Sequence, residues 1–199
     1  MSLRMIMVGP PGAGKGTQAV GLCERHNIIQ VSTGDLFRAH AAAGDELGQL
    51  ADSYTSRGEL VPDEVTNAMV RERLAQPDMA NGFLLDGYPR NPSQVGALDV
   101  MLIEQGLKID LVLELTADDD EVFARLLNRA KEQGRADDNE DVIRHRIDIY
   151  HASTKPLLDV YQERGILLKV DGSGTIDEVA NRIDATIAGF LTQVSRFVA

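Results

Sequence analysis

The sequence contains a single cysteine, Cys23, among 199 residues. One cysteine can form neither an internal disulfide nor a cysteine-rich zinc site, so both are excluded. The four histidines include no pair at the close spacing of metal ligands. We therefore expect no structural zinc.

Long apolar runs are also missing. No stretch approaches the ~20 consecutive apolar residues that span a bilayer as a helix. The first residues, MSLRM, lack the basic region and the long apolar segment of a signal peptide. We therefore expect a cytoplasmic protein with no membrane partner.

Basic residues are few. Lysine and arginine number 20 against 31 aspartates and glutamates, which gives a formal net charge of -11. This acidity argues against a nucleic-acid partner, because nucleic-acid binders present a basic surface. The apolar share of 43% and the length indicate one globular domain over 1–199.

Short apolar runs alternate with longer helical segments, which is typical of strand–helix units around a parallel sheet. The expected strands cover residues 3–8, 28–31, 83–85, 109–115 and 166–170. Their nearly continuous apolar character indicates helices on both faces of the sheet. We predict an α/β, three-layer fold with a five-stranded parallel sheet.

Three segments complete the pattern. Residues 32–61 are polar and helical in pattern, with no strand of their own. Residues 124–147 are dense in arginine and are broken by Gly134 and by residues 137–139, so we expect two helices joined by a turn. Residues 176–197 carry apolar side chains at the spacing of an amphipathic packing helix.

The most informative segment, GPPGAGKGT, covers residues 9–17 between the first expected strand and a helical segment. This is the context that a phosphate-binding loop (P-loop) requires. Its glycines let backbone N–H groups point inward, and the helix N-terminus adds a partial positive charge. Lys15 is then expected to reach the β- and γ-phosphates of a nucleotide. The general motif has Ser or Thr directly after the lysine, and here that position is Gly16.

With glycine at this position, the segment resembles the P-loop of the nucleoside monophosphate kinases, and that of the adenylate kinase family most closely. Three further segments resemble motifs of that family in the same order. They are STGD at 32–35 with Arg38, GFLLDGYPR at 82–90 with Gln94, and GRADDNE at 134–140 with Arg146. The resemblance covers nearly the whole chain.

The resemblance implies a phosphotransferase that moves a phosphoryl group reversibly from ATP to AMP, giving two ADP, in adenine nucleotide homeostasis. Its expected catalytic residues are Lys15, Arg90, Arg129, Arg135 and Arg146. Its expected ATP-binding residues are Gly12, Ala13, Gly14, Lys15, Gly16, Thr17, Arg125, Arg129 and Gly172. Its expected AMP-binding residues are Thr33, Arg38, Glu59, Leu60, Val61, Gly87, Tyr88, Pro89, Arg90, Gln94, Arg135 and Arg146. Glu59 departs from the family, whose members often carry a basic residue there.

Magnesium is the implied cofactor. Asp86 directly follows three apolar residues, so we expect it at the carboxyl end of a buried strand beside the P-loop, where a carboxylate can hold Mg²⁺. Because Gly16 has no hydroxyl, the ion is expected to depend on substrate oxygens, on water, and on Asp86 and Asp35.

The resemblance also divides the domain. It implies that residues 32–61 bind the acceptor nucleotide and that residues 129–135 form a short lid, too short for an inserted zinc-bearing lid. The family habit implies a monomer. Both segments are expected to close over the substrates and exclude water, because hydrolysis of ATP would compete with transfer.

Two alternatives remain at this point. A nucleotide-gated switch specific for GTP would usually carry an NKxD tetrapeptide, which the sequence lacks. A pyrimidine monophosphate kinase would share the fold and the phosphate contacts. In that comparison Thr33 and Gln94 favour adenine, since pyrimidine kinases usually have Ala and Asn at these positions.

Overall fold

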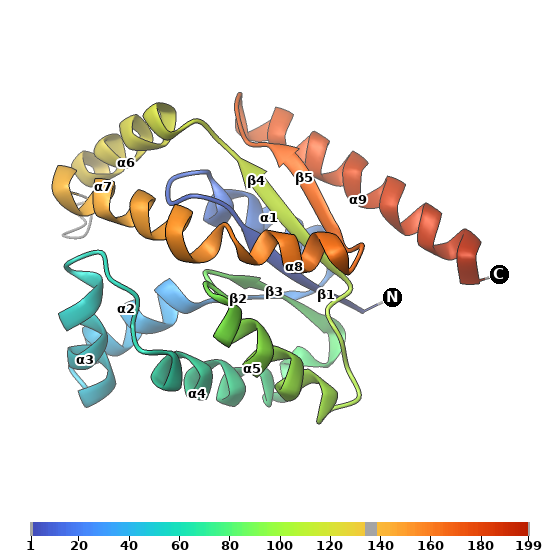
Figure 1. Cartoon of the computed structure of the whole chain (residues 1–199), viewed down its shortest axis with the longest axis horizontal. Coiled ribbons are helices and arrows are strands. Elements are labelled where there is room, and N and C mark those ends of the chain that lie inside the picture. The colour runs from blue at the N-terminus through green and yellow to red at the C-terminus, as the bar shows by residue number, and fades with distance from the viewer. Residues whose placement is uncertain (1, 134–138, 199) are drawn as a thin grey trace.

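A computed structural model describes residues 2–133 and 139–198 of the chain (Figure 1). Within this part of the chain, five strands form one parallel sheet in the order β2-β3-β1-β4-β5. The strands are β1 (Leu3–Val8), β2 (Ile29–Ser32), β3 (Gly82–Asp86), β4 (Leu111–Thr116) and β5 (Leu167–Asp171). The predicted α/β fold with a five-stranded parallel sheet is confirmed.

Helices connect the strands and cover the sheet. They are α1 (Lys15–His26), α2 (Thr33–Ala43), α3 (Glu46–Thr55), α4 (Asp63–Leu74), α5 (Pro92–Ile103), α6 (Asp119–Gln133), α7 (Glu140–Ile149), α8 (Leu157–Glu163) and α9 (Ile176–Val198). Two short segments add a 3₁₀ turn, η1 (Pro77–Asn81), and a π-helical turn, η2 (Tyr150–Thr154).

The sheet is buried on both faces because successive side chains of a strand point to opposite sides. In β1, Ile6 and Val8 pack in the core under α4, α5 and α8, while Met5 and Met7 pack in the core under α1 and α9. The nearly continuous apolar strands expected from the sequence therefore fill two separate cores, and Figure 1 shows the helices on either side of the sheet.

The bounds predicted for the first strand, 3–8, are confirmed, whereas those predicted for the other four strands from apolar runs were wrong by one or two residues. Each of the last four strands ends on a polar residue that the apolar runs left out: Ser32, Asp86, Thr116 and Asp171. Ser32 pairs with Asp86 and Thr116 with Asp171 in the sheet. Apolar character reports burial, whereas strand ends depend on these backbone pairings.

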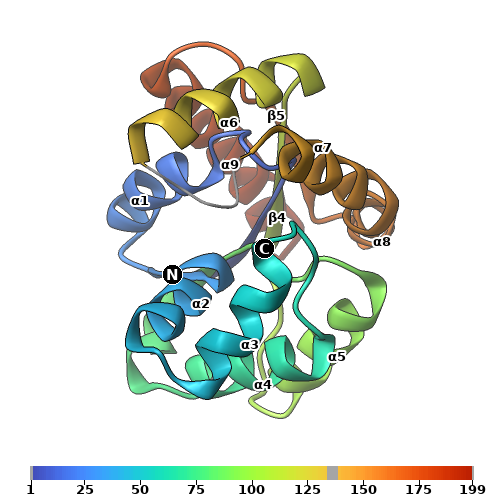
Figure 2. The same ribbon diagram turned by 90° about the vertical axis from the view of Figure 1, so that its left-hand side faces the viewer.

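The polar segment 32–61 folds into α2 and α3, which lie at the bottom of Figure 2, with α6 and α7 at the top. The arginine-dense segment forms α6 and α7, as expected. Residues 129–133 of the predicted lid belong to α6, and residues 134–135 lie outside the described part of the chain. Within the described ranges no helix is both long and apolar enough to cross a membrane.

Candidate active site

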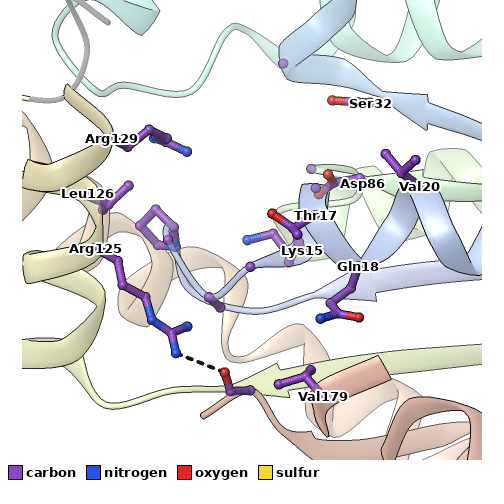
Figure 3. Close-up of a pocket in the computed structure, with 18 of the residues that line it drawn as sticks. Lys15, Thr17, Gln18, Val20, Ser32, Asp86, Arg125, Leu126, Arg129 and Val179 are labelled. Carbon is purple, nitrogen blue, oxygen red and sulfur yellow. Dashed lines mark hydrogen bonds between the residues drawn. The ribbon is translucent and has the colours of Figure 1, made fainter. Parts of the chain in front are cut away.

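The P-loop runs from the end of β1 into the first turn of α1. Gly14 caps that helix with a φ of 92°, a left-handed conformation that glycine adopts without steric cost. Lys15 Nζ donates to the carbonyl oxygens of Gly9 and Pro10, each at 2.8 Å. The loop thus wraps around its own lysine, which points into it in Figure 3.

Burial lowers the pKa of Lys15 to about 8. The negative charge of Asp86 opposes this shift, while the positive charges of Arg90, Arg146 and Arg129 add to it. Cations gathered in a dehydrated place raise one another's electrostatic energy, so this arrangement favours an anionic ligand.

A cavity of about 620 Å³ opens beside the loop. Residues of the P-loop line one side, and Arg125 and Arg129 reach it from α6 on the other (Figure 3). The Arg125 guanidinium donates to Glu121 Oε1 at 2.6 Å and to the Gly172 carbonyl at 3.1 Å. The Gly172 N–H donates to the Thr116 carbonyl at 2.8 Å, which leaves this N–H already engaged at the end of β5.

Asp86 ends β3 beside the P-loop, in register with Ser32 and Met7. Burial raises the pKa of its carboxyl group, and the charges of Lys15 and Arg90 oppose that shift. A Cβ atom added to Gly16 would stand 3.9 Å from Asp86 Oδ2, so the missing side chain leaves space in front of this carboxylate.

The second acidic residue, Asp35, lies in the first turn of α2 and pairs with Arg38 at 2.5 Å. Its charge contributes to the raised pKa of Asp86. Within residues 2–133 and 139–198, no group of three or more His, Cys, Asp or Glu side chains could hold a metal ion. A divalent cation here would therefore need oxygens from a substrate or from water.

A second cavity, of about 270 Å³, lies between α2, α3 and the segment that follows β3. Thr33, Glu59, Leu60, Val61 and Gln94 line it. The Thr33 hydroxyl and the Arg90 Nε both donate to the Gly87 carbonyl, at 3.0 Å and 2.7 Å. Thr33 and Arg90 therefore meet at the backbone oxygen of Gly87.

Gly87 has a φ of 80°, and a Cβ atom there would approach Thr33 Oγ1 to 2.8 Å. Both the backbone conformation and the close approach therefore require glycine at this position. Burial lowers the pKa of Arg90 to about 10, and the neighbouring charge of Arg146 adds to the shift.

The two cavities meet. Three arginines, Arg38, Arg90 and Arg146, line both of them, together with Gly34 and Gly87. Arginines offer planar, bidentate donors that match phosphate oxygens. The junction can therefore hold two phosphate groups that approach each other from opposite cavities.

The family comparison agrees with this geometry. A model of the adenylate kinase family matches residues 7–166. The chain is 56% identical to the adenylate kinase of Kocuria rhizophila over 184 residues, which covers 92% of this chain and 98% of the relative. It is 55% identical to that of Renibacterium salmoninarum, covering 94% and 96%, and 54% identical to that of Thermobifida fusca, covering 90% and 95%.

The chain belongs to the adenylate kinase family. The predicted family is thereby confirmed, and the chain is a phosphotransferase. Most of the site residues expected from the resemblance to adenylate kinases lie on the two cavities. Those on the larger cavity alone are Gly12, Ala13, Gly14, Lys15, Gly16, Thr17, Arg125, Arg129 and Gly172, with Asp35 and Asp86, while Arg38, Gly87, Arg90 and Arg146 line both cavities.

Two expected residues of this adenylate kinase family member lie elsewhere, and a third is not among the described residues. Tyr88 and Pro89 line neither of the two cavities, although they border a smaller one behind the P-loop. Tyr88 is fully buried, and its hydroxyl donates to Asn67 Oδ1 at 2.7 Å. Burial raises the pKa of Tyr88, and the charge of Asp63 adds to the shift. Arg135 lies outside the described residues.

Glu59, the residue that departs from the family pattern, borders the smaller of the two cavities. Its carboxylate accepts two hydrogen bonds from Arg57, at 2.7 Å and 3.2 Å, and both side chains are exposed. This pair neutralises the charge of Glu59, whose carboxyl pKa is lowered chiefly by the hydrogen bonds from Arg57.

Sequence reasoning missed four residues that line these cavities or contact residues that line them. Gln18 donates to the Ile176 carbonyl at 2.9 Å and fixes the start of α9 beside the larger cavity. Thr154, in the π-helical turn, donates to the Arg90 carbonyl at 2.9 Å. Asp63 and Asn91 both contact Gln94. The contacts of Gln18, Thr154 and Asp63 join residues far apart in sequence, so no local pattern indicates them. The Asn91 contact is a helix N-cap three residues before Gln94, a local signal that could have been found.

Proposed function

We propose that this enzyme catalyses the reversible transfer of the γ-phosphoryl group from ATP to AMP, giving two ADP. The observation that supports this most directly is the meeting of two cavities at Arg38, Arg90 and Arg146. A reaction between two phosphorylated nucleotides needs such a junction, because their negative charges repel and must be neutralised while the reacting groups align.

The larger cavity is proposed to bind ATP. Backbone N–H groups of residues 12–17 would hold its phosphates at the helix N-terminus, with Lys15 on the β- and γ-phosphates. Arg125 and Arg129 would contact ATP from α6, and Gly172 would lie near its base. Since the Gly172 N–H already donates to Thr116, any contact from Gly172 would come from its carbonyl or its Cα.

The smaller cavity is proposed to bind AMP. Arg38, Arg90 and Arg146 would hold its phosphate, and Arg135 would join them when residues 129–135 close. Leu60 and Val61 would contact the sugar and base, while Thr33 and Gln94 would bind the base edge. No general base is needed, because the attacking phosphate oxygen of AMP already carries negative charge.

Mg²⁺ bound to ATP would neutralise charge on its phosphate oxygens. Asp86 would hold the ion directly or through water, with Asp35 close by, and the space at Gly16 leaves room in front of Asp86. The remaining ligands would come from the nucleotide. That the enzyme works as a cytoplasmic monomer stays a prediction.

The test is a coupled assay of ADP formation at fixed Mg-ATP with AMP, CMP and UMP as acceptors. We expect AMP to exceed CMP and UMP at least about tenfold in kcat/KM, since unpaired polar groups in a base site cost about 1–3 kcal/mol each. Chelation of divalent ions should stop turnover and Mg²⁺ alone should restore it, with unchanged circular dichroism. Equal rates with CMP or UMP would support the pyrimidine kinase alternative instead.

A further inference from the structure

The buried side chain of Gln94 is held at both ends of its carboxamide. Its Oε1 accepts the backbone N–H of Arg90 at 2.7 Å, and its Nε2 donates to Asp63 Oδ1 at 2.7 Å. A backbone N–H can only donate, and an ionised carboxylate can only accept. These two partners therefore fix which end of the amide is oxygen and which is nitrogen.

Asp63 is itself held in place. It is the first residue of α4, and the same Oδ1 atom accepts from Asn91 Nδ2 at 2.9 Å. Asn91 caps α5, with its Oδ1 accepting the backbone N–H of Gln94 at 2.9 Å. Asp63, Asn91 and Gln94 thus form a closed set of hydrogen bonds between the starts of two helices.

Each end of the Gln94 amide keeps one unused bonding position. Nε2 has a second hydrogen and Oε1 a second lone pair, and Gln94 lines the proposed AMP cavity. Adenine presents an acceptor at N1 and a donor at N6, which match this nitrogen and oxygen. A 6-oxopurine presents the reverse order, a donor at N1 and an acceptor at O6.

A glutamine that could rotate its amide by half a turn would serve either base equally well. Here the rotated amide would turn its NH₂ group toward the Arg90 N–H and its oxygen toward the Asp63 carboxylate. Donor would face donor and acceptor would face acceptor in a buried place, which is strongly unfavourable.

We propose that Asp63 is a specificity-determining positioning residue, which makes the acceptor site reject 6-oxopurine nucleotides such as IMP by preventing rotation of the Gln94 amide. This inference rests on the proposed function, because it concerns the acceptor base of the same reaction. Asp63 acts through Gln94 and has no contact with the reacting phosphates.

The test compares kcat/KM for AMP and for IMP, at saturating Mg-ATP, in the unmodified protein and in Asp63→Asn. An asparagine can donate or accept, so it removes the mismatch at the Asp63 end of the rotated amide, while the Arg90 N–H still opposes rotation at the other end. We expect the AMP-to-IMP ratio to fall about tenfold, a factor typical of one lost hydrogen-bond mismatch. The change should appear in the acceptor KM, while the KM of ATP stays constant.

Glu64→Gln is the matched control. Glu64 is the next residue in the first turn of α4 and is exposed. Its substitution by glutamine removes the same charge from the same helix end. It should leave the AMP-to-IMP ratio unchanged. Asp63→Ser is a second variant in case Asp63→Asn folds poorly. Serine is suited to a helix start, but its side chain is too short to reach Gln94. This variant should also lower the AMP-to-IMP ratio.

An unchanged ratio in folded Asp63→Asn or Asp63→Ser would overturn the inference, as would an equal fall in Glu64→Gln or a lack of preference for AMP over IMP in the unmodified protein. These results differ from failure of the proposed function, in which the unmodified protein would not phosphorylate AMP at all.

Discussion

The two cavities recognise their ligands by different means. The larger one is built from a continuous loop of backbone, with a lysine that bonds to the carbonyls of Gly9 and Pro10 and with arginines from α6. The smaller one depends on side chains from separate elements, whose hydrogen bonds fix one another, as in the contacts of Gln94 with Arg90 and Asp63.

This difference has a physical basis. A phosphate is symmetric and charged, so a ring of N–H groups and cations binds it without needing any single orientation. A base edge carries donors and acceptors in a fixed order, so its site must hold its own amide in one orientation. We therefore expect substitutions in the larger cavity to act mainly by removing charge that binds phosphate. Substitutions in the smaller cavity should act mainly on the selectivity for the acceptor base.

The largest effect is expected from Lys15→Ala. Loss of this charge from the proposed site of the β- and γ-phosphates should lower kcat by about 10³-fold, because contacts to charge that develops in the transition state are worth this much. Initial rates at saturating ATP and AMP measure it, and thermal unfolding should show an intact fold. Native activity in a folded variant would contradict the assignment of the loop.

The next effect belongs to the smaller cavity. The double variant Thr33→Ala with Gln94→Asn should lower kcat/KM for AMP at least about tenfold, because the base loses its hydrogen bonds to these two side chains. The new alanine is small and the new asparagine is polar, so neither should block the cavity. The KM of ATP should remain constant. If the KM of ATP rose as much as that of AMP, the two cavities would not act separately, and the comparison would fail.

The two cavities also differ in how far the sequence alone predicts them. Residues 9–17 are contiguous, so the loop, its lysine and the following helix could be predicted together. The place of Asp86 at the carboxyl end of a buried strand could also be predicted, because it directly follows three apolar residues. The last residues of β2, β4 and β5 could not, because Ser32, Thr116 and Asp171 are polar and their place in the sheet depends on pairing with a neighbouring strand.

The smaller cavity was predictable only in part. Thr33 and Gln94 follow from the resemblance to the family, but Asp63 lies 31 residues before Gln94 and looks like an ordinary acidic residue at a helix start. Its hydrogen bond to Gln94 exists only because α4 and α5 begin side by side. The fold, rather than any local pattern, creates this part of the site.

A third prediction uses the lowered pKa of Lys15, about 8 in the protein without nucleotide. Bound phosphates favour the charged form and raise this pKa again, so above about pH 8 ATP binding must take up a proton. By linkage, the Kd of ATP should then rise by up to about tenfold per pH unit. Calorimetry near pH 9 in two buffers of different ionisation enthalpy measures the uptake.

Lys15→Arg is the control for this experiment. Arginine keeps its charge throughout this range, so the variant should bind ATP with no proton uptake, even if more weakly. Equal uptake in both proteins would assign the proton to another group. The result would assign the proton uptake to the lysine of the loop.

The smallest effect is expected from Glu59→Gln, at the position that departs from the family pattern. Glu59 borders the smaller cavity, but its charge is paired with Arg57 and both side chains are exposed. Exposed ion pairs are screened by water and salt and contribute little, so the KM of AMP should change less than about twofold. Initial rates at varied AMP measure it, with Arg57→Gln as the partner variant. A large fall in the KM of AMP in Glu59→Gln alone would mean that this carboxylate repels the acceptor phosphate. The smaller cavity would then depend on local charge, as the larger one does.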